Sequence, residues 1–187
     1  MDLNQHTNAL MNAACSPSAG SSVAGFFYID GIPTKGLWID LLPVRSWEDI
    51  QTQLEAAYPD SVVDEILIAD CEGHIVRPFV TSSCDGFSMD EWADFAEALE
   101  STHLDIEVVE AYCSNFYYPS DCEIDKIEES YVGQFDSDED FATDMLEQCG
   151  DLDSMPEGLR CYFDYEKYAR DLMFDYFEVD GYYFRNL

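Results

Sequence analysis

The sequence predicts an α+β protein made of three small consecutive domains. Short runs rich in aromatic and β-branched residues near both ends of the chain indicate small antiparallel sheets, and segments with apolar residues at helical spacing lie between and beside them. With 47% hydrophobic and 14% aromatic residues, the 187-residue chain can bury a core, unlike a disordered acidic chain. We expect a disordered leader over residues 1–22, followed by domains at 23–84, 85–122 and 123–187.

The first predicted domain consists of a small sheet and one helix. Residues 26–29 and 37–41 predict two strands, joined by a loop over 30–36 that contains two glycines. Ser46 followed by Asp49 is typical of a helix N-cap with an acidic residue at N3, and Pro59 ends the helix. Residues 65–69 complete the sheet as its third strand.

Two amphipathic helices make up the second predicted domain. Ser88 can cap the first helix, whose apolar residues at i, i+3, i+4 and i+7 are Trp92, Phe95, Ala96 and Leu99. The second helix begins near Asp105 and places Glu107 and Glu110 on its outer face. Its inner face consists of Ile106, Val109 and either Tyr112 or Cys113.

A strand, two helices and a hairpin make up the third predicted domain. The strand covers residues 131–135, and the helix after it begins at Ser137 with capping-box character and ends at Gly150. The inward residues of this helix are Phe141, Met145 and Leu146. Asp164 caps a further helix, and Asp180-Gly181 predicts a type I′ turn between the two final strands.

Acidic residues are concentrated in the middle of the chain. The protein has 40 acidic and 8 basic residues, and its formal net charge is −32. Residues 78–159 contain 23 of the acids and a single base, Lys126. Such a charge repels other polyanions, which argues against binding to nucleic acid or to an anionic membrane. A protein adapted to high salt would spread its acids over all surfaces, so the clustering also argues against that class.

The acids form stripes on the predicted helices. Asp90, Asp94 and Glu97 share one helix face at i, i+4 and i+7, and the same spacing recurs at Asp140, Asp144 and Glu147. Like charges at i, i+4 each cost a few tenths of a kcal/mol, and the lysines of an ordinary solvated face are missing here. We therefore interpret the acids as a functional anionic surface. Duplex DNA carries one charge per about 1.7 Å of axis, so 40 carboxylates match roughly 68 Å of duplex.

Other site chemistries fit the sequence poorly. Four acids between Asp136 and Glu147 occupy positions 1, 3, 5 and 12 of an EF-hand loop, but position 6 is Phe141 where that loop needs glycine. The zinc-ligand types Cys71, His74 and Cys84 lack an obvious fourth partner. The sequence has no phosphate-binding loop and no Gly-x-Ser-x-Gly nucleophile motif. We expect no enzyme activity, no metal and no cofactor.

The cysteines and the apolar pattern indicate an intracellular setting. Seven cysteines without framework spacing favour reduced, mostly buried thiols. No run of 18 apolar residues occurs, and residues 1–22 lack the basic and apolar regions of a secretory signal. We expect a cytoplasmic protein.

Several blocks of the sequence resemble the ArdA-type antirestriction proteins, which are small acidic proteins encoded on plasmids, conjugative transposons and phages. The most specific blocks are MPEGL at 155–159, YFDYEKYARDL at 162–172 and the hairpin at 177–184. Similar blocks are GLWID at 36–40, IADCE at 68–72 and YVGQFDS at 131–137. The resemblance covers roughly residues 26–187, and the chain departs from the family in its leader and its number of cysteines.

The resemblance implies an elongated, curved homodimer that mimics bent B-form DNA. Such a protein occupies the DNA-binding groove of type I restriction–modification enzymes, formed by their DNA-recognition and methyltransferase subunits, and protects incoming mobile-element DNA. We expect the DNA-mimic surface to consist of Asp90, Asp94, Glu97, Glu107, Glu110, Asp138, Asp140, Asp144 and Glu147. The alternative function is an acidic adaptor or chaperone that uses the same surface on other basic DNA-binding proteins.

The resemblance also places the dimer contact in the third domain. An apolar strand and its neighbour there can pair across a two-fold axis. The residues expected in this contact are Tyr131, Val132, Phe135 and Phe141. An ordinary core position for all four is the other interpretation.

Overall fold

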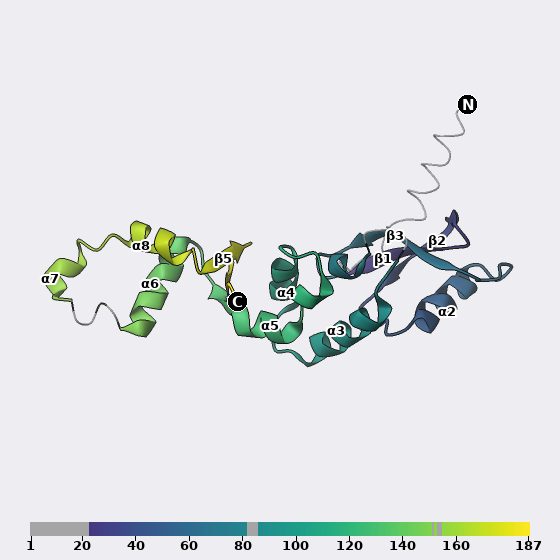
Figure 1. Cartoon of the computed structure of the whole chain (residues 1–187), viewed down its shortest axis with the longest axis horizontal. Helices are drawn as coiled ribbons and strands as arrows, with labels where there is room; N and C mark the ends of the chain where they lie inside the picture. The colour runs from purple at the N-terminus through teal and green to yellow at the C-terminus, as the bar shows by residue number, and fades with distance from the viewer. Residues whose placement is uncertain (1–22, 82–85, 151, 153–154) are drawn as a thin grey trace, which may run out of the picture. The chain divides into compact units, whose positions relative to one another are not determined.

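The chain is an α+β protein, as predicted. The structure, a computed structural model, describes residues 23–81, 86–150, 152 and 155–187, and these residues form seven α-helices and two three-stranded antiparallel sheets (Figure 1). The predicted leader over residues 1–22 lies outside the described residues. The chain divides into an N-terminal unit, residues 1–124, and a C-terminal unit, residues 125–187.

The N-terminal unit begins with a sheet in the order β2-β1-β3. Its strands are β1 (Ala24–Ile29), β2 (Ile32–Asp40) and β3 (Ile66–Glu72). Asp30 and Gly31 both have positive φ, 54° and 68°, so the hairpin closes with a two-residue turn of the I′ kind. The predicted loop over 30–36 is therefore too long, because β2 already begins at Ile32. Residues 33–35 still leave the ladder, since Tyr28 pairs with Gly36 and the next pair joins Ile29 to Ile32.

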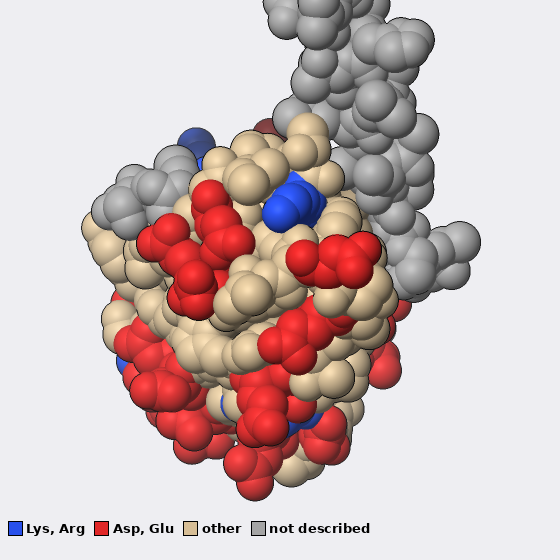
Figure 2. Space-filling view, turned by 90° about the vertical axis from the view of Figure 1, so that its right-hand side faces the viewer, with Lys and Arg blue, Asp and Glu red and all other residues tan. Residues whose placement is uncertain are grey.

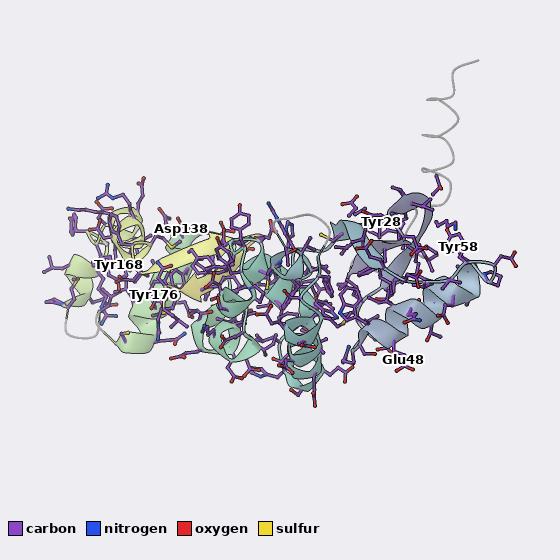
Figure 3. The ribbon with its side chains drawn as sticks, turned by 45° about the vertical axis from the view of Figure 1, so that its right-hand side comes forward. Tyr28, Glu48, Tyr58, Asp138, Tyr168 and Tyr176 are labelled. Atoms are coloured by element: carbon purple, nitrogen blue, oxygen red, sulfur yellow. The ribbon has the colours of Figure 1, made fainter. Side chains whose placement is uncertain are left out.

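Helix α2 (Trp47–Ala57) lies along the sheet and begins as predicted (Figure 1). The Ser46 side chain accepts a hydrogen bond from the Asp49 backbone, and the Asp49 carboxylate accepts one from the Ser46 backbone at 2.8 Å. Two residues of the helix, Ile50 and Leu54, are fully buried. After the helix, the hydroxyl of Tyr58, labelled in Figure 3, donates to the Gly36 carbonyl of β2 at 2.7 Å.

The middle of the chain is helical, as predicted. Its elements are η1 (Arg77–Phe79), α3 (Met89–Ser101), α4 (Ile106–Cys113) and η2 (Pro119–Asp121). Ser88 stands at the N-cap of α3, but its side chain makes no capping hydrogen bond to a described residue. The inner face of α3 packs its aromatic rings closely, with the Trp92 ring 5.3 Å from Phe79 and 5.7 Å from Phe95 between centroids.

One core joins the sheet to α3. The Phe87 ring contacts Phe27 of the sheet at 5.8 Å and Trp92 of α3 at 5.9 Å. The Trp92 indole donates to the Leu41 carbonyl at 3.2 Å. The Arg45 guanidinium donates to the Ala96 carbonyl within α3 and pairs with Glu100 near the end of that helix. Both of the first two predicted domains thus contribute to the N-terminal unit, and their division from each other stays a prediction.

The C-terminal unit contains a sheet in the order β4-β6-β5. The elements from here to the end of the chain are α5 (Ile124–Ser130), β4 (Tyr131–Gln134), α6 (Asp138–Cys149), α7 (Glu157–Arg160), α8 (Tyr165–Leu172), β5 (Tyr176–Val179) and β6 (Tyr182–Arg185). Positive φ at Asp180 and Gly181, 52° and 83°, confirms the predicted turn. Helices α5 and α7 were not predicted from the sequence.

Local capping fixes the helices of this unit. Ser137 accepts a hydrogen bond from the Asp140 backbone at the start of α6, and Gly150 ends that helix with φ of 68°. Asp164 accepts one from the Lys167 backbone at 3.0 Å at the start of α8. Packed against Phe141, Tyr176 and Tyr183 are Val132, Phe135, Met145, Leu172 and Met173.

Candidate functional site

The acidic stripe of α3 faces solvent. Asp90, Asp94 and Glu97 are all exposed, whereas Trp92 and Phe95 on the opposite face are buried. Within the described part of the chain, no side chain donates a hydrogen bond to these three carboxylates. The predicted outward orientation is therefore correct.

The acidic stripe of α6 is also on the surface, but neighbouring donors hold most of it. Asp138, Asp140 and Glu147 are exposed and Asp144 is half-buried. The Tyr183 hydroxyl donates to Asp138 at 2.7 Å, the Ser137 hydroxyl to Asp140 at 2.6 Å and the Gln148 amide to Asp144 at 2.6 Å. Asp138, labelled in Figure 3, and Asp140 also lie in the first turn, where the helix dipole favours negative charge.

The two acids that were predicted on the surface of α4 differ in their exposure. Glu107 is exposed, but Glu110 is half-buried and one of its oxygens accepts a hydrogen bond from the His74 backbone at 2.5 Å. The other oxygen is buried without a hydrogen-bond partner among the described residues. Burial raises the pKa of Glu110. The prediction that Glu110 points outward is wrong, because position 110 follows Ile106 by one turn and so borders the apolar face.

Few cations are available to neutralise these acids. At least five of the eight basic side chains contact groups of their own chain, namely Arg45, Arg77, Arg160, Arg170 and Arg185. The contacts range from carbonyl hydrogen bonds of Arg45 to the Arg77 guanidinium 4.8 Å above the Tyr117 ring. On the face drawn in Figure 2, acidic side chains gather in several groups and basic side chains are few.

Two basic residues lie close to the start of α6. An open groove of about 470 Å³ there is lined by Asp138, Glu139, Asp164, Glu166, Lys167 and Arg170, among others. This groove mixes four acids with two bases, so the first turn of α6 has cations nearby. The α3 stripe has no basic residue in its own helix.

The metal-ligand patterns of the sequence do not form metal sites in the described structure. Asp138, Asp140 and Glu147 lie inside α6, so residues 136–147 are not a calcium-binding loop. Cys84, one of the three zinc-ligand types, lies outside the described residues. Within residues 23–81, 86–150, 152 and 155–187, no three His, Cys, Asp or Glu side chains are grouped so as to hold a metal ion.

The described cysteines differ in their exposure. Cys113 and Cys122 are buried free thiols, but Cys149 and Cys161 are exposed, so the expectation of mostly buried thiols is wrong for these two. No helix in the part of the chain that the structure describes is long and apolar enough to cross a membrane.

The four residues predicted at the dimer contact do not share one environment. Tyr131, Val132 and Phe135 are half-buried on or beside β4, which is an edge strand of its sheet. Phe141 is fully buried, with its ring stacked on Tyr183 at 4.6 Å between centroids. The Phe141 side chain is a core residue, so it has no surface to offer a second subunit.

Sequence reasoning missed the residues that hold the α6 carboxylates. Gln148 follows Asp144 by four residues, so their pairing is readable from helical spacing. Tyr183 is 45 residues from Asp138, and no local pattern joins the two. Only the packing of the C-terminal hairpin against α6 brings this hydroxyl to the acidic surface.

An α+β fold whose helices carry exposed carboxylates, in a chain of net charge −32, defines a strongly acidic protein. The family model described as antirestriction protein (ArdA) matches residues 28–185. The chain therefore belongs to the ArdA antirestriction protein family, which confirms the resemblance and assigns it an antirestriction function. A search of curated proteins found no match.

Proposed function

We propose that the protein inhibits type I restriction–modification enzymes by imitating B-form DNA. Its exposed carboxylates take the place of phosphates in the DNA-binding groove formed by the DNA-recognition and methyltransferase subunits. The enzyme is then occupied and incoming mobile-element DNA escapes it. The inhibition is competitive because the protein and DNA occupy the same groove. It is stoichiometric because the protein makes and breaks no bond.

The observation that carries the proposal is the exposure of acidic stripes on α3 and α6 in a chain of net charge −32. A cationic groove that binds DNA gains free energy when counterions are released, and a dense array of carboxylates provides the same gain. Long-range electrostatics spreads this gain over many charges, so no single carboxylate is essential. Eight of the nine predicted surface acids remain in the proposed surface: Asp90, Asp94, Glu97, Glu107, Asp138, Asp140, Asp144 and Glu147.

Glu110 is left out of the proposed surface. Its carboxylate is half-buried against the His74 backbone, where a basic groove on a partner cannot reach both oxygens. Its raised pKa also makes it the less dependable charge of α4. We assign it a role in joining α4 to the turn at residues 73–75.

Neutralising each stripe tests the surface. Two triple variants, D90N/D94N/E97Q on α3 and D140N/D144N/E147Q on α6, each remove three charges. The control E48Q/E55Q/D60N removes three exposed charges from α2 and the turn after it, which lie outside the proposed surface. We expect both stripe variants to raise the Kd for a purified type I methyltransferase and to flatten its dependence on salt, whereas the control changes neither strongly.

Three results would contradict the proposal. Failure of the wild-type protein to block a type I enzyme at near-stoichiometric amounts would remove the function. Equal effects of the stripe and control variants would show that net charge alone, and not a defined acidic surface, determines binding. Complete loss of inhibition in the single variant D94N would contradict distributed electrostatics. Binding to unrelated basic DNA-binding proteins without inhibition of type I enzymes would favour the adaptor function.

We also propose that the protein is a homodimer joined through the edge strand β4. Tyr131, Val132 and Phe135 supply partly exposed apolar surface there, and an antiparallel partner strand would extend the sheet at this edge. Light scattering on F135D and V132K tests this. Both side chains also pack against the core around Phe141, and the Phe135 ring lies 5.3 Å from the Phe141 ring, so circular dichroism must first show that each variant is folded. A folded monomer is expected, and a folded V132K dimer would exclude β4 from the contact.

A further inference from the structure

Three carboxylates of α6, two on its acidic stripe and Asp138 on another side of the helix, are held by neutral donors. Tyr183 donates to Asp138, Ser137 to Asp140 and Gln148 to Asp144, each within 2.7 Å. A neutral donor restricts the rotation of a carboxylate and leaves its charge intact. A cation in the same place would cancel the charge. The C-terminal unit thus fixes acidic groups in space while keeping them anionic.

Tyr183 differs from the other two donors because it is anchored in the core. Its side chain is 2% exposed, and its ring stacks on Phe141 and meets Phe135 edge-on at 5.5 Å between centroids. Only the hydroxyl reaches the surface, where it meets Asp138 at the first turn of α6. Burial and the bond to Asp138 raise the pKa of Tyr183, so the hydroxyl keeps its proton and remains a donor.

Asp138 lies in a groove that also contains two basic side chains. Lys167 and Arg170 line the same open groove as Asp138. A carboxylate released from the tyrosine hydroxyl would have two cations within the groove to turn toward. An ion pair with either would withdraw one negative charge from the surface presented to a partner.

We propose that Tyr183 is a positioning residue for partner binding, which holds the Asp138 carboxylate in the orientation that a basic groove recognises. The inference rests on the proposed function and deepens it. A phosphate in DNA is held in place by its backbone, whereas a surface aspartate samples several rotamers that binding must freeze. The hydroxyl of Tyr183 restricts those rotamers before binding, so the ordering cost is already met by folding.

A double-mutant cycle tests this positioning role. The four proteins are wild type, Y183F, D138N and Y183F/D138N, and the readout is the Kd for a purified type I methyltransferase over a range of salt concentrations. Freezing one side chain corresponds to about a threefold to tenfold change in Kd, which is the increase expected for Y183F. The salt slope of Y183F should decrease by no more than the one charge that an ion pair of Asp138 would withdraw. In the D138N background, Tyr183→Phe should have no further effect.

A matched control separates positioning from folding. Tyr162→Phe removes a hydroxyl from a tyrosine that is 82% exposed, and the Kd should not change. An effect of Tyr183→Phe that is equal in both backgrounds would show a purely structural role and overturn the inference. A Y183F protein that binds as tightly as wild type would overturn it as well.

A second measurement does not need the partner. Three-bond couplings between the Hα and Hβ protons of Asp138 report its χ1 rotamers by NMR. We expect one dominant rotamer in the wild-type protein and averaging in Y183F. Averaging in both proteins would overturn the inference whatever the binding assay shows. A wild-type protein that has a fixed Asp138 but binds no type I enzyme would instead reject the proposed function.

Discussion

Helices α3 and α6 carry the same acidic spacing in different settings. Each presents acids at i, i+4 and i+7 on one face and buries aromatic or aliphatic residues on the other. Asp90, Asp94 and Glu97 receive no hydrogen bond from a described side chain, although Arg45 pairs with Glu100 near the end of α3. Neighbours donate to Asp140 and Asp144 of the α6 stripe and to Asp138 on another side of that helix. Equal spacing therefore occurs without hydrogen-bond donors to the carboxylates on one helix and with donors to two of the three on the other.

The number of charges on a surface and the positions at which they are held affect binding in different ways. Counterion release depends on how many charges meet a basic groove, and both stripes contribute to it equally. Recognition of a defined groove depends also on where each charge is held, and only the α6 stripe has donors that hold it. We expect changes in α3 to act through charge number and changes in α6 to act through number and position.

The largest expected effect comes from the cores beneath the two helices. Trp92→Ala and Phe141→Ala each remove a fully buried ring and cost about 3–5 kcal/mol of unfolding free energy. All three tryptophans, Trp38, Trp47 and Trp92, lie in the N-terminal unit, so their fluorescence reports on that unit alone. In urea titrations, we expect Phe141→Ala to shift the far-ultraviolet circular dichroism transition and to leave the tryptophan transition in place.

The matched control is the milder Phe141→Leu, which keeps an apolar side chain and should shift the same transition less. If Phe141→Ala moved the tryptophan transition as far as the circular dichroism transition, the two units would unfold together. The comparison between α3 and α6 would then describe one cooperative structure rather than two.

Local rules predicted much of the fold. The Ser46–Asp49 capping box, the Asp180-Gly181 turn and the αL cap at Gly150 depend on side chains and backbone within a few residues of each other. Helix α5 was missed because its seven residues contain only two buried apolar positions, Ile124 and Ile127, too few to define a period. The early start of β2 was missed because a turn of Asp30 and Gly31 alone closes the hairpin.

The candidate site was predictable only in part, because spacing defines a helix face but not what packs against it. The outward stripe of α3 followed from its apolar face. Glu110 was misplaced because the turn at His74, distant in sequence, covers that side of α4. Phe141 was predicted at the dimer contact because no local pattern shows that it is buried. The residues that bury it, Tyr176 and Tyr183, come from the C-terminal hairpin.

Glu110 gives a smaller, pH-dependent effect that contrasts a buried acid with exposed ones. Burial raises its folded pKa above the unfolded value of 4.5, so the fold favours the protonated form. Its contribution to stability is present below the unfolded pKa and is lost as pH rises through the folded pKa. Glutamine does not titrate, so the unfolding free energy of E110Q relative to wild type should increase between about pH 4 and pH 8.

Urea titrations followed by tryptophan fluorescence at several pH values measure this difference. The control E107Q changes an exposed acid on the same helix, and its difference from wild type should depend much less on pH. His74 is the charged neighbour that acts on the pKa of Glu110, so every variant in this comparison keeps His74. A flat profile for E110Q would show that the Glu110 carboxyl is as well solvated as that of Glu107.

The smallest expected effect compares one aspartate from each stripe. Asp94→Asn relieves repulsion from Asp90 and Glu97 and should stabilise the protein by about 0.2–0.5 kcal/mol for each pair. Asp144→Asn relieves the same kind of repulsion but weakens the hydrogen bond from Gln148, so its gain should be smaller or reversed. Urea titrations of both variants, alone and with Gln148→Ala, measure the difference. In the Q148A background the two substitutions should become equal, and high salt should remove the gain of Asp94→Asn. A gain for Asp144→Asn that matches Asp94→Asn with Gln148 present would mean that the amide does not hold the carboxylate, and that the α6 stripe is as mobile as the α3 stripe.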